Sequence, residues 1–170
     1  MYQAAVKLRL LNYLFNLHPD LEATVDIDGM ELRGKERKQQ IGQICKTRLQ
    51  NLSQTKQLQI NKTHPSYKNS KKRPDIFALS KHSNLTYIIE CEGAGSQQMN
   101  VKMYSALSQI IINMKNSMNP NDIYGIAVPN KQAYTNQLRK IPQHIRQLLN
   151  IHFFLIERSG VKIIEPNQSF

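Results

Sequence analysis

The sequence contains no tryptophan and only two cysteines, Cys45 and Cys91. Their spacing matches no zinc motif, and two cysteines are too few for the disulfide framework of a small secreted domain. We therefore expect neither a structural zinc site nor a disulfide scaffold. Low cysteine use of this kind is typical of a reducing compartment, so we expect a cytoplasmic protein.

Long hydrophobic runs are also absent. The longest, residues 110–112 and 153–156, are far shorter than the ~20 apolar residues that span a bilayer. Lys7 and Arg9 lie inside an amphipathic pattern rather than ahead of an apolar block. We expect no membrane span and no signal peptide. A chain of 170 residues is long enough to bury a core of its own as one domain.

Acidic residues are scarce in one segment, residues 33–73. It holds 12 lysines and arginines but a single acid, Glu36, whereas the rest of the chain has 11 basic and 11 acidic residues. The net charge of +11 therefore arises from this segment, which predicts a polyanionic partner. The alternative is a solubilising loop. The candidate DNA-binding residues are Lys35, Arg37, Lys38, Lys46, Arg48, Lys68, Lys71, Lys72 and Arg73.

Hydrophobic periodicity predicts a mixed α/β fold. Apolar residues recur at helical spacing from Val6 to Leu14 and alternate at strand spacing from Ala23 to Ile27. Residues 53–73 predict a long basic loop with a short strand near residues 58–60. We expect one domain over residues 1–170, with a mixed central sheet flanked by helices. The expected helices are 3–17, 35–52, 97–114 and 136–149, and the expected strands are 22–27, 75–79, 85–92, 123–128, 151–156 and 161–164.

Three acids lie on the predicted hairpin of residues 75–92. If its loop is centred near His82, antiparallel pairing places Asp75 beside Glu90, and Glu92 shares the face of Glu90. Ile89 and Cys91, the two neighbours of Glu90 in the sequence, then point the opposite way, toward the core. Clustered carboxylates need a compensating cation or a retained proton, and oxygen ligands suit Mg²⁺. The alternative is three separately solvated surface acids.

Two stretches of this hairpin resemble the motif of the PD-(D/E)xK nuclease superfamily. They are Arg-Pro-Asp-Ile at residues 73–76 and Tyr-Ile-Ile-Glu-Cys-Glu-Gly at residues 87–93. The resemblance covers about residues 74–164. It implies a restriction-endonuclease-like sheet and an endonuclease that hydrolyses DNA with Mg²⁺, or with Mn²⁺ as a substitute. It also implies that Asp75, Glu90 and the carbonyl of Cys91 bind the metal.

The sequence departs from the family motif at Glu92, which stands where the family has lysine. Three explanations stay open. Glu92 acts as a base or a metal contact; Lys102 on the next helix replaces the lysine; or catalysis is lost and a DNA-binding protein remains. A solvated helix residue is the simpler interpretation of Lys102. A basic RNA-binding domain is a further alternative for the whole chain.

Other residues have weaker roles in this prediction. Tyr104 and Gln109 resemble the helix that often follows the motif in the family, and Glu36 is either an accessory acid or a salt-bridge partner within its helix. The expected partner is double-stranded DNA. Because cutting two strands usually requires two sites, we expect a homodimer or a larger symmetric homo-oligomer.

Overall fold

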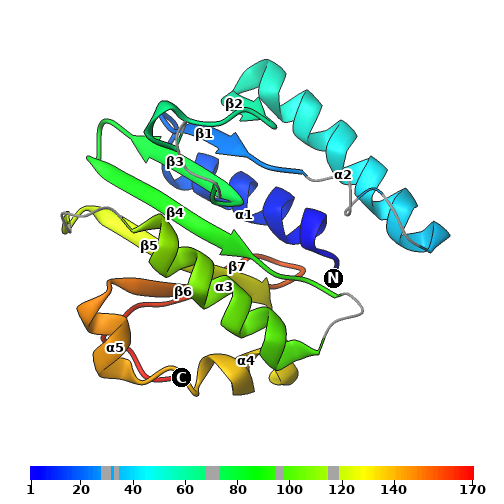
Figure 1. Cartoon of the computed structure of the whole chain (residues 1–170). Coiled ribbons are helices and arrows are strands. Elements are labelled where there is room, and N and C mark those ends of the chain that lie inside the picture. Colours follow the sequence, from blue (N-terminus) through cyan, green and yellow to red (C-terminus); the bar gives the residue numbers. More distant parts are fainter. Residues whose placement is uncertain (28–31, 33–34, 68–72, 95–97, 115–118) are drawn as a thin grey trace.

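The computed structural model describes residues 1–27, 32, 35–67, 73–94, 98–114 and 119–170. A seven-stranded mixed sheet forms its centre, and helices cover both faces (Figure 1). The expected fold class, a mixed α/β sheet flanked by helices, is confirmed.

Helices and strands alternate along most of the chain. The helices are α1 (Gln3–Leu17), α2 (Glu36–Thr55), the 3-10 turn η1 (Pro65–Tyr67), α3 (Met99–Asn113), α4 (Gln132–Leu138) and α5 (Gln143–Leu148). The strands are β1 (Glu22–Val25), β2 (Gln57–Ile60), β3 (Ile76–Ser80), β4 (Leu85–Cys91), β5 (Asp122–Pro129), β6 (Ile151–Ile156) and β7 (Val161–Ile164).

The strand order across the sheet is β2-β1-β3-β4-β5-β6-β7. β3 and β4 form the expected antiparallel hairpin, with Ile76 opposite Ile89. β4, β5 and β6 run parallel to one another. Parallel strands in the middle of a sheet are normally covered on both faces, and that is the case here.

Each face of the sheet has its own hydrophobic core. Val6, Leu10 and Leu14 form one fully buried stripe of α1, which packs with α2 on the first face. Met103 and Ile110 of α3 pack on the opposite face with residues of α4, β4, β5 and β6. The side chains of β4 are therefore buried on both sides of the sheet. Ile89 and Cys91 face a core as expected, and the opposite face of β4, which carries Ile88 and Glu90, is covered as well.

Two further expectations concern a C-terminal helix and an edge strand. The single helix expected over residues 136–149 is wrong: α4 and α5 are separated at Pro142, because proline disfavours helical backbone at the residue before it. The short strand expected near residues 58–60 is β2, which pairs in parallel with β1 at the edge of the sheet.

None of the helices in the described ranges has the length and apolar character to cross a membrane.

Candidate active site

Asp75 lies immediately before β3, at the end of the sheet where β4 stops. The β3–β4 register, continued by one residue from the Ile76–Ile89 pair, brings Asp75 level with Glu90, as expected. One oxygen of its carboxylate, Oδ2, accepts a hydrogen bond from the backbone N–H of Cys91 at 2.8 Å. The other oxygen lies 2.7 Å from Nζ of Lys7. Asp75 is thus tied both to β4 and to α1.

Helix α1 delivers two polar side chains to this point. Lys7 is only 2% exposed, and its ammonium also donates to the carbonyl of Asp26 at 2.6 Å. Gln3 Nε2 donates to the carbonyl of Cys91 at 2.7 Å and lies 3.2 Å from Asp75 Oδ2. The beginning of α1 lies beside the end of β4, so side chains of α1 reach Asp75 and Cys91 directly (Figure 1).

Glu90 lies beneath α3 and is only 3% exposed. Its Oε1 accepts a hydrogen bond from Asn113 Nδ2 at 3.1 Å. Burial raises the pKa of Glu90 to about 9, and the negative charges of Asp75 and Glu92 act in the same direction. Glu90 is therefore a carboxyl group that holds a proton at neutral pH unless an additional cation compensates its charge.

Glu92 and Lys102 form a pair between the end of β4 and the first turn of α3. Their Oε2 and Nζ atoms are 3.6 Å apart, and Lys102 also donates to the carbonyl of Gly93. Lys102 is 8% exposed, so its interpretation as a solvated helix lysine is wrong. Burial raises the pKa of Glu92 to about 7; Lys102 opposes this rise, and Asp75 adds to it.

The three carboxylates act on one another electrostatically, because the charge of Asp75 raises the pKa of both glutamates. Two ammonium groups, those of Lys7 and Lys102, lie against this acidic cluster. Three carboxylates with two ammonium groups leave one negative charge to be neutralised by a proton or by a further cation.

The donors of this cluster are chemically suited to a hard divalent cation, since they are carboxylate oxygens and the carbonyl of Cys91. Their surplus negative charge also favours one. Within the described ranges, however, no three or more His, Cys, Asp and Glu side chains are already arranged to hold a metal ion. Lys7, Lys102 and Asn113 occupy carboxylate oxygens instead, so an incoming cation has to compete with these side chains.

The accessory candidates lie apart from these contacts. Glu36 is exposed in the first turn of α2 and accepts a hydrogen bond from the neutral side chain of Gln40 on the same helix, so the salt bridge expected there stays a prediction. Tyr104 is 62% exposed on the outer side of α3. Gln109 donates to the hydroxyl of Ser105 on the same helix.

The candidate DNA-binding residues divide into three groups. Arg73 pairs with Asp26 and donates to Thr63, so it braces the segment that leads into Asp75. Lys68, Lys71 and Lys72 lie outside the described residues. The others are on α2 or at its start, and their side chains are exposed or half-buried: Lys35, Arg37, Lys38, Lys46 and Arg48.

Sequence reasoning missed Lys7, Gln3 and Asn113. Lys7 did carry a signal, because it lies three and seven residues before Leu10 and Leu14, on the apolar stripe of the helix, where a charge needs a partner. Gln3 and Asn113 carried none, since ordinary polar residues near helix ends are usually solvated. Comparison with family models, curated proteins and solved structures finds no match to this chain.

Proposed function

We propose that the protein is a metal-dependent endonuclease that hydrolyses phosphodiester bonds in DNA at the cluster of Asp75, Glu90 and Glu92. The observation that carries the proposal is the Glu92–Lys102 pair. The sequence has Glu where the nuclease motif has lysine, and α3 brings a buried ammonium to within 3.6 Å of that glutamate. The positive charge that the motif position lacks is thus present beside it.

Asp75, Glu90 and the carbonyl of Cys91 are the groups that would hold a divalent cation. When bound, such an ion supplies Lewis-acid stabilisation of the charge that develops on the phosphoryl group. Gln3 already donates to the Cys91 carbonyl, and Lys7 binds Asp75, so α1 fixes both donors in place, although a cation has to displace Lys7 from the carboxylate in order to bind there. These contacts hold the donors in position before a substrate arrives.

Glu92 is suited to accept a proton from the attacking water. Its pKa of about 7 leaves a substantial ionised fraction at neutral pH and makes it a stronger base than an ordinary glutamate. Lys102 orients the Glu92 carboxylate and holds a positive charge next to it. The proton accepted by Glu92 therefore remains close to an ammonium that favours its release.

The test is cleavage of supercoiled and linear DNA with Mg²⁺ or Mn²⁺. We expect nicking or discrete fragments with the native protein, and a loss of at least about a hundredfold with Asp75→Asn. Glu22→Gln is the matched control, because Glu22 is an acid on β1 that pairs with the exposed Lys81. Cleavage by Asp75→Asn at the native rate would remove the site assignment.

A second candidate function is DNA binding without catalysis. The close ion pair between Lys7 and Asp75 favours it, because an internal ammonium already takes the place of a metal ion at one carboxylate. This candidate predicts salt-sensitive retention of DNA with no cleavage in any divalent cation.

A further inference from the structure

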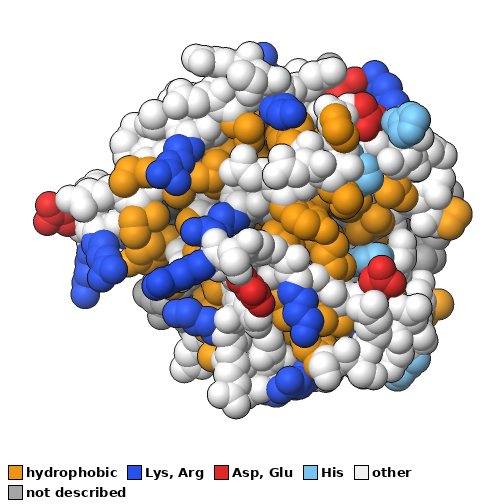
Figure 2. Space-filling view, turned by 180° about the vertical axis from the view of Figure 1, so that it is seen from behind, with side chains coloured by type: hydrophobic (Ala, Val, Ile, Leu, Met, Phe, Trp, Pro, Cys, Tyr) orange, Lys and Arg blue, Asp and Glu red, His pale blue; other side chains and the backbone are white. Residues whose placement is uncertain are grey.

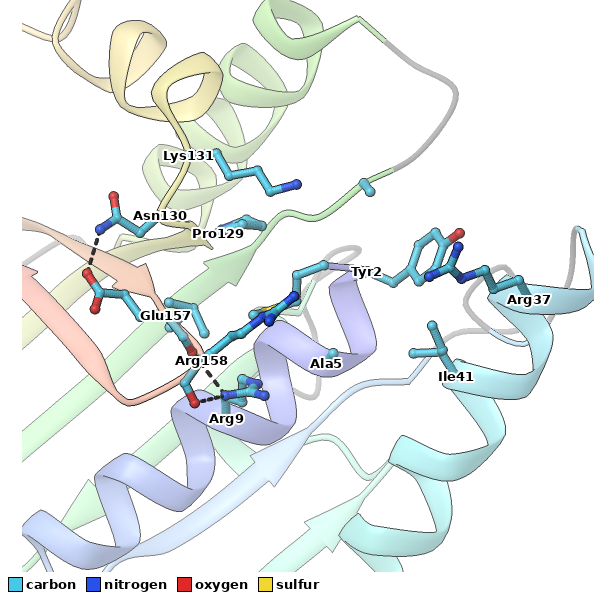
Figure 3. Close-up of a pocket in the computed structure, with 13 residues that line it drawn as sticks. Tyr2, Ala5, Arg9, Arg37, Ile41, Pro129, Asn130, Lys131, Glu157 and Arg158 are labelled. Carbon is cyan, nitrogen blue, oxygen red and sulfur yellow. Dashed lines mark hydrogen bonds between the residues drawn. The ribbon is translucent and has the colours of Figure 1, made fainter.

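Two clefts adjoin along the outer side of α1, between α1, α2 and the turn that joins β6 to β7. Their volumes are about 660 and 610 Å³, and both are lined by Ala5, Arg9, Ile41 and Arg158. Because they share these residues, the two clefts are direct neighbours, and we call the pair the α1–α2 groove. Figure 2 views the molecule from the side opposite to Figure 1, and Figure 3 shows the first cleft in detail.

The rim of the α1–α2 groove is positively charged. Its cations come from α1, α2, the start of α4 and the β6–β7 turn: Arg9, Arg37, Arg48, Lys131 and Arg158. Among the lining residues that the structure describes, Glu157 is the one acid, and its carboxylate accepts a hydrogen bond from Asn130 at 2.6 Å. Lysine and arginine side chains spread over this side of the molecule, with few acids between them (Figure 2).

Arg9 organises this rim. Its Nη1 donates to the carbonyls of Glu157 and Arg158 at 3.0 and 2.6 Å, which ties the β6–β7 turn to α1 (Figure 3). The turn thereby holds Arg158 over the groove, opposite Arg37 of α2. These contacts fix the guanidinium of Arg9 and the backbone that carries Arg158 beside the groove.

The wall of the groove is largely apolar and contains two aromatic rings, those of Tyr2 and Tyr13. Ile44 is 53% exposed there, and Ile41 lines both clefts. Cationic rims over aromatic and aliphatic surfaces are typical of sites where a nucleic-acid backbone runs along the charges while unstacked bases lie on the apolar side chains.

One end of the groove lies next to the acidic cluster. Ala94 lines the first cleft and directly follows Gly93, whose carbonyl binds Lys102. Tyr2 lines the same cleft and precedes Gln3, which reaches Asp75 and Cys91. A strand seated in the groove would therefore lead toward the candidate active site.

We propose that the α1–α2 groove binds single-stranded nucleic acid, with phosphates on the arginine rim and bases against Tyr2, Tyr13, Ile41 and Ile44. A duplex keeps its bases stacked inside and offers nothing to the apolar wall, whereas an unpaired strand uses both parts of the site. Binding of the strand in the groove does not depend on the proposed nuclease activity. Only the expectation that the bound strand leads to the acidic cluster rests on that proposed function.

The test is fluorescence anisotropy with a labelled oligothymidylate and with a duplex of equal length, both without divalent cations. We expect the native protein to bind the single strand more tightly. The triple variant Arg37→Gln, Arg48→Gln, Arg158→Gln should weaken single-strand binding at least about tenfold and reduce the salt slope by about 2, since each lost phosphate contact contributes about 0.7.

The matched control replaces three exposed lysines outside the groove, Lys62→Gln, Lys81→Gln and Lys140→Gln, with the same loss of net charge. It should bind within about twofold of the native protein. Ile44→Glu tests the apolar wall and should weaken single-strand binding more than duplex binding. Equal losses in both triple variants, tighter binding of the duplex, or displacement of the strand by polyglutamate at equal charge concentration would overturn the proposal.

Asp75→Asn separates this proposal from the proposed function. The variant should lose cleavage and keep native single-strand binding. If the native protein cuts no DNA, and the triple variant Arg37→Gln, Arg48→Gln, Arg158→Gln loses single-strand binding, the proposed nuclease activity is wrong and the proposed binding groove stands. If the native protein cuts DNA, and the arginine triple variant binds and cuts like the lysine control, the proposed binding groove is wrong and the proposed nuclease activity stands.

Discussion

At the residue scale, Glu90 is the group whose charge state depends most on its surroundings. Burial beneath α3 and the charge of Asp75 raise its pKa to about 9, far above the ordinary value of a glutamate. The folded protein therefore retains a proton that the unfolded chain releases at lower pH. Stability contributed by this group is complete below its unfolded pKa and is lost as pH rises toward its folded pKa.

Glu90→Gln should remove this pH dependence. Without divalent cations, we expect the native protein to lose about 1 to 3 kcal/mol of unfolding free energy between about pH 5 and pH 8. The variant, whose amide has no proton to release, should lose clearly less. Urea denaturation at both pH values measures the difference, and parallel losses in the two proteins would contradict the assigned burial of Glu90 as a protonated group.

Lys102 controls the titration of Glu92. Its ammonium opposes the rise in the pKa of Glu92, so Lys102→Met should raise that pKa above about 7. Because Glu92 has to be ionised to accept a proton, the acidic limb of the pH profile for kcat/KM should shift to higher pH in the variant. An unshifted limb with a lower plateau would mean that Lys102 acts on the substrate and not through Glu92.

At the element scale, the site depends on how closely α1 approaches the end of β4. Gly93 permits this approach: a Cβ at that position would lie 2.3 Å from the backbone nitrogen of Gln3 and 2.6 Å from the carbonyl carbon of Tyr2. Both atoms belong to the backbone, so α1 itself would have to move. The contacts of Gln3 and Lys7 with Asp75 depend on the same approach.

Gly93→Ala should therefore destabilise the protein by about 2 kcal/mol or more and reduce cleavage even where the variant is fully folded. Gly160→Ala is the control, because a Cβ there meets nothing within 4 Å. It should leave stability within about 0.5 kcal/mol of the native value. Thermal or chemical denaturation compares the two variants. Similar stability of both would show that α1 tolerates displacement from β4.

Local patterns predicted most of the elements but not how they assemble. Short hydrophobic segments between turn residues predicted β3, β4, β6 and β7 nearly to their ends, and the Asp75–Glu90 pairing followed from hairpin geometry. The burial of Glu90 could not be predicted in this way, because it depends on α3 folding back over β4. Period-2 alternation separates two faces of a strand, and it does not say that both are covered.

At the scale of the whole molecule, the distribution of charge along the sequence differs from its distribution in space. The excess of +11 belongs to residues 33–73, yet the α1–α2 groove takes Arg9, Lys131 and Arg158 from segments whose net charge is zero. Folding therefore builds a basic surface from residues that no local charge count identifies. The nucleic-acid partner stays a prediction, and the predicted contact residues do not all coincide with the groove: Lys35, Lys38 and Lys46 do not line it.

The expected homodimer or larger symmetric assembly stays a prediction at this scale. Two-strand cleavage requires two acidic clusters on one duplex, whereas a single-strand substrate requires only one. Sedimentation equilibrium with and without DNA distinguishes these cases. A dimer in the presence of duplex supports the two-strand requirement, and a monomer that still cuts an unpaired strand would show that one copy is sufficient.

A metal-dependent nuclease site requires that the acidic cluster of Asp75, Glu90 and Glu92 take up a divalent cation. Calorimetric titration of Mn²⁺ into the native protein and into Asp75→Asn, near neutral pH, measures this uptake. We predict one saturable site in the native protein, with protons released from Glu90 as the cation displaces them, and no such site in the variant. No binding in the native protein, or equal binding in both, would contradict a metal-dependent site at Asp75, Glu90 and Glu92.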